Sequence, residues 1–207
     1  EWMRANLPPI FEGLKRLGAP LTHYKVCSTF DSAPEIGSIG IAAEIGRQVF
    51  EPDWIPLVVG APAIGRYQVF GNLFAAADNV IHRLDRHPVM SHHPATPMDE
   101  ADLGLHLSRQ TSLKTGCVDF LAMTTGRVDV ALESVISDGS SIVAIDAMDD
   151  ATLRIAGRMI SESGVTFAIG SQGIEYALVA HMRETGQLPA EYPSPKLSSV
   201  EQLFAVS

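Results

Sequence analysis

Short apolar and β-branched runs alternate with longer helical patterns along most of this 207-residue chain. The predicted strands lie at 21–28, 55–61, 116–123, 141–148 and 165–171, and the predicted helices at 9–17, 38–50, 98–112, 127–137, 149–163 and 173–186. Such an alternation predicts an α/β fold, a Rossmann-like three-layer domain with a mostly parallel sheet and helices on both faces.

Three local features refine this prediction. Pro9 is expected in the first turn of its helix, because proline is tolerated there. Thr96 or Asp99 is expected to cap the helix over 98–112. The long stretch 62–97 is predicted to contain a hairpin, with Gly71 and Asn72 at its turn.

Composition excludes several classes of protein. Hydrophobic residues make up 46% of the chain, which is enough to bury a sizeable core, so wholesale disorder is excluded. No apolar run approaches the roughly 20 residues that a membrane helix needs. The net charge is −9 and no basic cluster occurs, so neither nucleic acid nor membrane is an expected partner. Cys27 and Cys117 form no disulfide framework and no CxxC site, so the expected location is the reducing cytoplasm.

Polar residues follow the first predicted strand, and active sites of parallel sheets lie at the carboxyl ends of strands. Lys25, Ser28, Thr29, Asp31 and Ser32 are therefore expected to converge on one ligand. An ordinary strand–turn–helix with a Ser, Thr or Asp cap is the alternative.

Two glycine-containing turns are predicted to bind an anion through backbone N–H groups at the start of a helix. The first contains Gly37 and Gly40, and the second contains Gly170 and Ser171. Asp146 ends another predicted strand, where a cap for the following helix is favoured over a catalytic base.

The segment from Gly60 to Gly65 resembles the start of a P-loop, but Arg66 and Tyr67 replace the required Lys and Ser or Thr. We therefore reject a Walker-type site. Gly65 and Arg66 are retained as substrate-binding candidates, since a guanidinium group binds carboxylate or phosphate bidentately. A surface arginine beside a glycine turn is the alternative.

Four histidines lie at positions 82, 87, 92 and 93, but their spacing matches neither a helical pair nor a zinc finger. No metal site is expected. The loop is instead predicted to border a polar site, with Arg86 and His93 as ligand-binding candidates. A Cys27–His23 nucleophile pair is disfavoured, because residues i and i+4 on a strand are about 13 Å apart. Cys117 is expected in the core.

Several segments together resemble the four-carbon acid sugar kinase family, specifically its N-terminal substrate-binding domain. They are YKVCSTFDSAPEIGSIG, VVGAPAIGRYQVFGNLF, RHPVMSHHPATPMDEADL, SIVAIDAMDDATL and FAIGSQGIEYAL, in the order of the family. YKVCSTFDS and HHPATPMDEADL are most similar to the 3-oxo-tetronate kinase branch. Other branches carry Lys-x-Asp-Ser-Thr-Leu-Arg-Gly at the first of these sites, whereas Cys27, Phe30, Asp31 and Ser32 replace the Asp, Leu, Arg and Gly here.

The resemblance implies ATP-dependent phosphorylation of the terminal hydroxyl of a four-carbon sugar acid of the 3-oxo-tetronate, threonate or erythronate type. In that scheme Lys25 and Arg66 hold the carboxylate or the developing phosphoryl charge, while Ser28, Thr29 and Asp31 bind hydroxyls, and Asp31 is the candidate base. A modest polar set suffices, because positioning and electrostatics account for most of the catalysis of phosphoryl transfer.

The resemblance also implies a division of the protein. Residues 1–186 are expected to form the substrate-binding domain, truncated at its N-terminus because the family's Asp-Asp-x-Thr-Gly strand end is missing. Residues 187–207 are expected to be a linker, in which VEQLFAVS begins a further strand, toward an absent C-terminal domain that binds ATP and Mg²⁺. No cofactor is expected on this chain, which alone is predicted to be inactive.

A different class of function stays open. A truncated relative retained as a non-catalytic binding or interaction module, including relatives labelled type III effectors, is the alternative to the kinase hypothesis. Loss of the first strand would expose a sheet edge, and self-association into a homo-oligomer would cover it.

Overall fold

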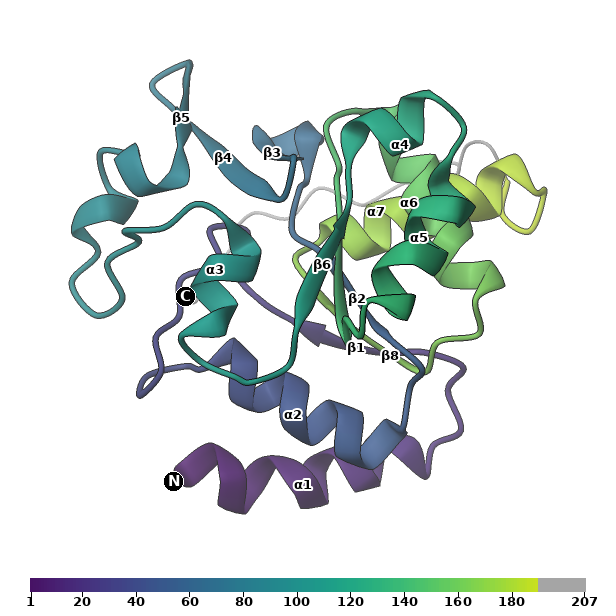
Figure 1. Cartoon of the computed structure of the whole chain (residues 1–207), viewed down its shortest axis with the longest axis horizontal. Helices are drawn as coiled ribbons and strands as arrows, with labels where there is room; N and C mark the ends of the chain where they lie inside the picture. The colour runs from purple at the N-terminus through teal and green to yellow at the C-terminus, as the bar shows by residue number, and fades with distance from the viewer. Residues whose placement is uncertain (190–207) are drawn as a thin grey trace, which may run out of the picture.

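A five-stranded parallel sheet forms the centre of the protein in the computed structural model, which describes residues 1–189 (Figure 1). The strand order is β1 (Thr22–Lys25), β8 (Phe167–Gly170), β2 (Ile55–Val58), β7 (Ile142–Ile145) and β6 (Thr115–Val118), with every neighbouring pair parallel. The predicted α/β class with a parallel sheet is confirmed.

Helices cover both faces of this sheet (Figure 1). One face is covered by α1 (Trp2–Lys15), α2 (Ile39–Phe50) and α3 (Leu103–Ser108), and the other by α4 (Phe120–Thr124), α5 (Val128–Ser137), α6 (Asp150–Glu162) and α7 (Gly173–Glu184). Ile55 and Leu57 of β2 pack into the first of these cores, whereas Val58 packs into the second. Burial on both faces explains why the central strands are continuous apolar runs.

A second sheet lies over the carboxyl end of the first (Figure 1). It contains three antiparallel strands, β3 (Arg66–Val69), β4 (Asn72–Ala77) and β5 (Val80–Arg83), and is flanked by the 3₁₀ helices η1 (Pro62–Ile64), η2 (Leu84–Arg86) and η3 (Met90–His92). The predicted hairpin exists, but the prediction of its turn was wrong by one residue. Phe70 and Gly71 form the turn with φ of 49° and 70°, as a two-residue turn that matches the strand twist requires.

The first helix begins earlier than predicted and contains Pro8 and Pro9 in its interior. Leu7 and Phe11 of α1 pack into an apolar core to which α2 also contributes. This apolar face outweighs the missing proline N–H groups, and the prediction that Pro9 lies in the first turn was wrong.

Two further predicted boundaries, one of a helix and one of a strand, were wrong. The helix predicted over 98–112 is only α3, and Asp102 caps it by accepting from the Leu105 N–H at 2.9 Å, not Thr96 or Asp99. The preceding residues are extended because Ala101 accepts from the Leu73 N–H of β4. The strand predicted over 116–123 ends at Val118, where the chain turns into α4.

Within residues 1–189, no helix combines the length and the apolar character needed to cross a membrane. Most of the predicted linker and the strand predicted at VEQLFAVS lie outside the described residues.

Candidate functional site

The carboxyl ends of all five parallel strands meet at one edge, which the hairpin sheet covers. The loop 26–32 leaves β1 at this edge, and Ser171, Asp146 and Asp119 follow β8, β7 and β6. This is the edge at which the sequence predicted a polar site, since ligands of parallel α/β sheets bind there.

Asp31 is the centre of a small polar cluster in the loop after β1. The Thr29 hydroxyl donates to Asp31 Oδ1 at 2.7 Å, and the Cys27 Sγ lies 3.0 Å from the same hydroxyl. Burial alone would raise the pKa of Asp31, but the bonds from Thr29 and Cys27, together with nearby His93, lower it below its usual value. Asp31 is therefore an ionised carboxylate, able to accept a hydrogen bond from a substrate hydroxyl.

Lys25, Ser28 and His93 are three further residues that the sequence predicted at this site. Lys25 ends β1 with an exposed side chain, and its Nζ donates to the Val26 carbonyl at 2.8 Å. Ser28 is half-buried in the turn. His93 Nδ1 accepts from the Thr96 N–H at 3.1 Å, which orients the ring in the loop that faces Asp31.

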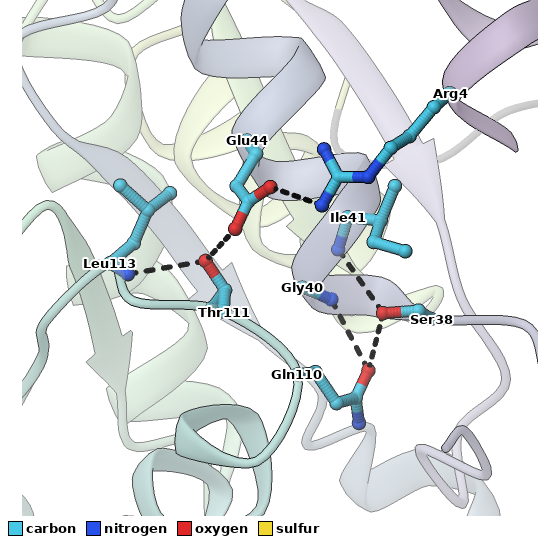
Figure 2. A network of polar contacts seen from close by, with 8 residues as sticks. All are labelled: Arg4, Ser38, Gly40, Ile41, Glu44, Gln110, Thr111 and Leu113. Atoms are coloured by element: carbon cyan, nitrogen blue, oxygen red, sulfur yellow. Dashed lines mark hydrogen bonds and ion pairs between the residues drawn. The ribbon is translucent and has the colours of Figure 1, made fainter. Parts of the chain in front are cut away.

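Ser32 and Gly40 are engaged inside the protein. Gln110 Nε2 donates to Ser32 Oγ at 2.9 Å, and the same hydroxyl lies 2.9 Å from His106 Nε2. Figure 2 shows the other end of this amide, whose oxygen accepts from Ser38 Oγ at 3.2 Å and from the Gly40 N–H at 3.3 Å. Gln110 thus occupies the position at the start of α2 where an anion was expected.

The remaining glycine-turn candidates differ in their surroundings. Gly37 is exposed, with φ of 61°. The Gly170 carbonyl accepts from the Val26 N–H at 2.8 Å. Ser171 is fully buried, and its hydroxyl donates to the Val59 carbonyl at 2.6 Å and accepts from the Gly173 N–H at 3.1 Å. These contacts join β8, β2 and α7.

Gly65 and Arg66 lie where η1 joins β3. Gly65 has φ of 68°, a left-handed conformation that favours glycine. Arg66 NH1 lies 3.3 Å from the carbonyls of Ile64 and Gly65 and 3.5 Å from that of Ala76. Arg86 is exposed on η2.

Two buried side chains that the sequence did not single out as ligands attach the hairpin sheet to the edge. Gln68 Oε1 accepts from the Val59 N–H at 2.8 Å, and its Nε2 donates to the Ile145 carbonyl at 2.8 Å. Asp146 accepts from the N–H groups of Phe70, Gly71 at 3.0 Å and Phe120 at 2.8 Å.

The prediction that Asp146 caps the following helix was therefore wrong. Asp149 caps α6 through a capping box with Thr152, leaving Asp146 to bind the hairpin turn. Burial raises the pKa of Asp146, with Asp119 adding to the effect.

The geometry gives little support to a cysteine nucleophile or to a metal site. His23 Nε2 lies 2.9 Å from the Gly170 carbonyl and its Nδ1 lies 3.2 Å from Glu175, so both ring nitrogens face away from the Cys27–Thr29 contact. Burial raises the pKa of the Cys117 thiol. Among residues 1–189, no three His, Cys, Asp or Glu side chains are grouped so that they could hold a metal ion.

Fold and site together define an α/β binding domain. Its polar side chains gather at the carboxyl ends of the parallel strands, under the hairpin sheet. Residues 1–178 match the family model of the sugar-binding N-terminal domain, and the chain belongs to this family. A 3-oxo-isoapionate kinase from Paraburkholderia graminis is 47% identical, over all of this chain and 44% of that protein. A 3-oxo-tetronate kinase from Cupriavidus necator is 30% identical, over 86% of this chain and 40% of that protein. The resemblance to an N-terminal sugar-acid kinase domain is confirmed.

Solved structures agree on the fold. A Haemophilus influenzae protein superposes with a TM-score of 0.72 at 25% identity, over 83% of this chain and 40% of that one. A Bordetella bronchiseptica domain of unknown function, a domain-swapped dimer with bound citrate, superposes with a TM-score of 0.65 at 22% identity, over 88% and 42%. The chain spans less than half the length of the relatives it matches.

Proposed function

We propose that this chain is the acid-binding part of an ATP-dependent kinase that phosphorylates a sugar acid. The observation that carries this proposal is the 47% identity to a 3-oxo-isoapionate kinase across the whole chain. Matches to 3-oxo-tetronate kinases support a small 3-oxo sugar acid as the substrate class. Residues 1–186 are the proposed binding domain, and the nucleotide and Mg²⁺ belong to a part of the protein outside this chain.

The loop after β1 is the proposed hydroxyl-binding end of the site. Thr29 fixes the ionised Asp31 carboxylate, so that it can accept a hydrogen bond from the substrate hydroxyl and take its proton during transfer. Lys25 and Ser28 are proposed to contact the same hydroxyl or the developing phosphoryl charge. ATP supplies the phosphoryl group.

Calorimetry on this chain tests the proposal with D-threonate, D-erythronate and their 3-oxo relatives, and with Mg-ATP alone. We expect binding of an acid but not of Mg-ATP, and loss of acid binding in Lys25→Ala. Lys114→Ala is the matched control, because Lys114 is an exposed lysine whose Nζ donates to a backbone carbonyl at 2.6 Å, as Lys25 does at 2.8 Å. Binding of Mg-ATP to this chain would overturn the division between domains, and no acid binding would favour a non-catalytic module.

Two further properties follow as proposals. The strand β1 lies at the edge of the parallel sheet, and an exposed edge favours self-association. Cys27 and Cys117 are both free, which suits the cytoplasm.

A further inference from the structure

A group of basic side chains lies on one face of the hairpin sheet. Arg66 of β3 and His82 of β5 both pair with Ala75 of β4, and directly paired residues project from the same face. The ring of His87, from the loop after β5, lies 5.9 Å from the ring of His82 between centroids. The small side chain of Ala75 thus lies between the longer side chains of Arg66 and His82, and His87 lies beside His82.

Two N–H donors of this group are buried and have no hydrogen-bond partner among the described residues. His87 is 5% exposed, and its Nδ1 accepts from the N–H groups of Val89 and Met90, both at 3.2 Å. In the neutral ring the proton therefore lies on Nε2, which is buried and unpartnered. The Nε of Arg66 is buried and unpartnered as well. Buried donors are almost always paired with protein, water or a ligand.

The two donors belong to one location. Arg66 NH1 lies 3.5 Å from the Ala76 carbonyl, and the His87 ring lies beside the same carbonyl. Burial lowers the pKa of His87, the Ala76 carbonyl beside the ring opposes this shift, and nearby Arg66 and His82 add to the lowering. The ring is therefore neutral and carries its proton on Nε2. Asp85, the acidic residue nearest in sequence, is bonded to Arg83 at 2.7 Å. The two side chains whose charge affects the pKa of His87, Arg66 and His82, are both basic.

We propose that Arg66 and His87 form an anion subsite that binds the carboxylate of the sugar acid. This inference rests on the proposed function, and it adds His87, which the sequence had weighed only as a metal ligand. A carboxylate offers two acceptor oxygens, which match the guanidinium Nε–H and the imidazole Nε2–H. The loop that carries His87 also places His93 beside Asp31. The subsite therefore holds the acid end of a substrate whose hydroxyl end lies at Asp31.

Calorimetry with the 207-residue chain tests this assignment, with D-threonate, its neutral analogue D-threitol and inorganic phosphate as probes. His87→Asn keeps an acceptor where Nδ1 holds the turn but removes the distal donor, whereas His87→Gln keeps a distal donor and loses the turn acceptor. Arg66→Gln removes the guanidinium group. Arg83→Gln is the charge-matched control, since Arg83 lies on the same hairpin sheet and pairs with Asp85.

We expect D-threonate to bind about tenfold or more weakly to His87→Asn and Arg66→Gln, because each variant loses a charge-assisted hydrogen bond. His87→Gln should retain most of the affinity at a lower melting temperature, and Arg83→Gln should match wild type. D-Threitol, which lacks the carboxylate, should bind weakly and equally to all variants. Nitrogen-15 spectra of the histidine rings should show the His87 Nε2 signal shift when D-threonate is added.

The outcomes separate the subsite from the proposed function. Unchanged D-threonate affinity in His87→Asn and Arg66→Gln, with loss in Lys25→Ala, would overturn the subsite and leave the function standing. Phosphate binding that depends on Arg66 and His87, without any binding of D-threonate, would support an anion subsite and overturn the sugar-acid function. An absence of binding by every probe would overturn both.

Discussion

The parallel sheet and the hairpin sheet that covers it are stabilised by different interactions. Strands β2, β7 and β8 are buried at every residue, so the parallel sheet depends on apolar burial between two helical layers. The hairpin sheet is attached through two fully buried polar side chains, Gln68 and Asp146. Apolar burial tolerates many substitutions, whereas a buried polar group is costly as soon as its partner is lost. Substitutions in the two sheets should therefore lower the stability of the protein in different ways.

The largest expected effect is on the helix layer of the parallel sheet. Gly157 lies inside α6 where the Ala177 carbonyl of α7 and the His181 Cβ leave no room for a methyl group. Gly157→Ala should lower the free energy of unfolding by about 3 kcal/mol, because a backbone carbonyl cannot move aside cheaply. Gly13→Ala is the matched control. Its site in α1 is open, so it should gain about 0.5–1 kcal/mol in urea denaturation. Equal losses in both variants would contradict close packing of α6 on α7.

The second prediction concerns the attachment of the hairpin sheet. Gln68→Leu preserves most of the volume but leaves the Val59 N–H and the Ile145 carbonyl buried without these partners. We expect a loss of about 2–3 kcal/mol. Hydrogen exchange should show faster opening of residues 66–83 than of the parallel strands. Asn72→Ala, which removes an exposed bond to the Phe70 carbonyl on the same hairpin, should change little. Uniform loss of protection in both sheets would show that they unfold as one unit.

A third prediction compares two contacts of α2, both drawn in Figure 2. Ser38 caps the helix by accepting from the Ile41 N–H at 3.2 Å, and it is buried. Ser38→Ala should cost about 1 kcal/mol. Arg4, with a 58% exposed side chain, pairs with Glu44 at 2.9 Å, and Arg4→Ala should cost less than about 0.5 kcal/mol in thermal unfolding. The reverse ranking would contradict the capping of α2 by the buried Ser38.

The smallest expected effects are on the pH dependence of stability. The folded-state pKa of Asp31 is lowered, so its contribution is present above about pH 4 and is lost as the pH falls through the folded value. The folded-state pKa of Asp146 is raised, so its contribution is present below about pH 4 and is lost as the pH rises through the folded value.

Asp31→Asn should therefore lose less stability than wild type on acidification below pH 4, and Asp146→Asn should lose less as the pH rises above it. Urea denaturation across this range measures both slopes. Asp53→Asn, an exposed carboxylate on the loop before β2, is the control and should follow wild type. Shifts of the same sign in the two variants would contradict the opposite environments of Asp31 and Asp146.

The parallel sheet could be predicted because its signals are local. The apolar runs that became β2, β7 and β8 are buried on both faces, and their periodicity needs no knowledge of distant residues. The candidate site was predicted in part for the same reason, since Thr29 and Asp31 follow β1 directly and bond to each other. Errors occurred where a distant segment changed a local preference, as when β4 holds Ala101 in an extended conformation and shortens the following helix.

The sequence by itself therefore determined the α/β class, the family and the loop that carries Asp31, because each depends on neighbours along the chain. Only the tertiary structure decided which polar groups face one another. Gln110 reaches Gly40 across 70 positions, Asp146 reaches Gly71 across 75, and His87 meets the face that carries Arg66 through the folding of the hairpin sheet. No local pattern encodes such pairs, because the hydrogen-bonding need of a buried polar group is met by whatever the fold brings beside it.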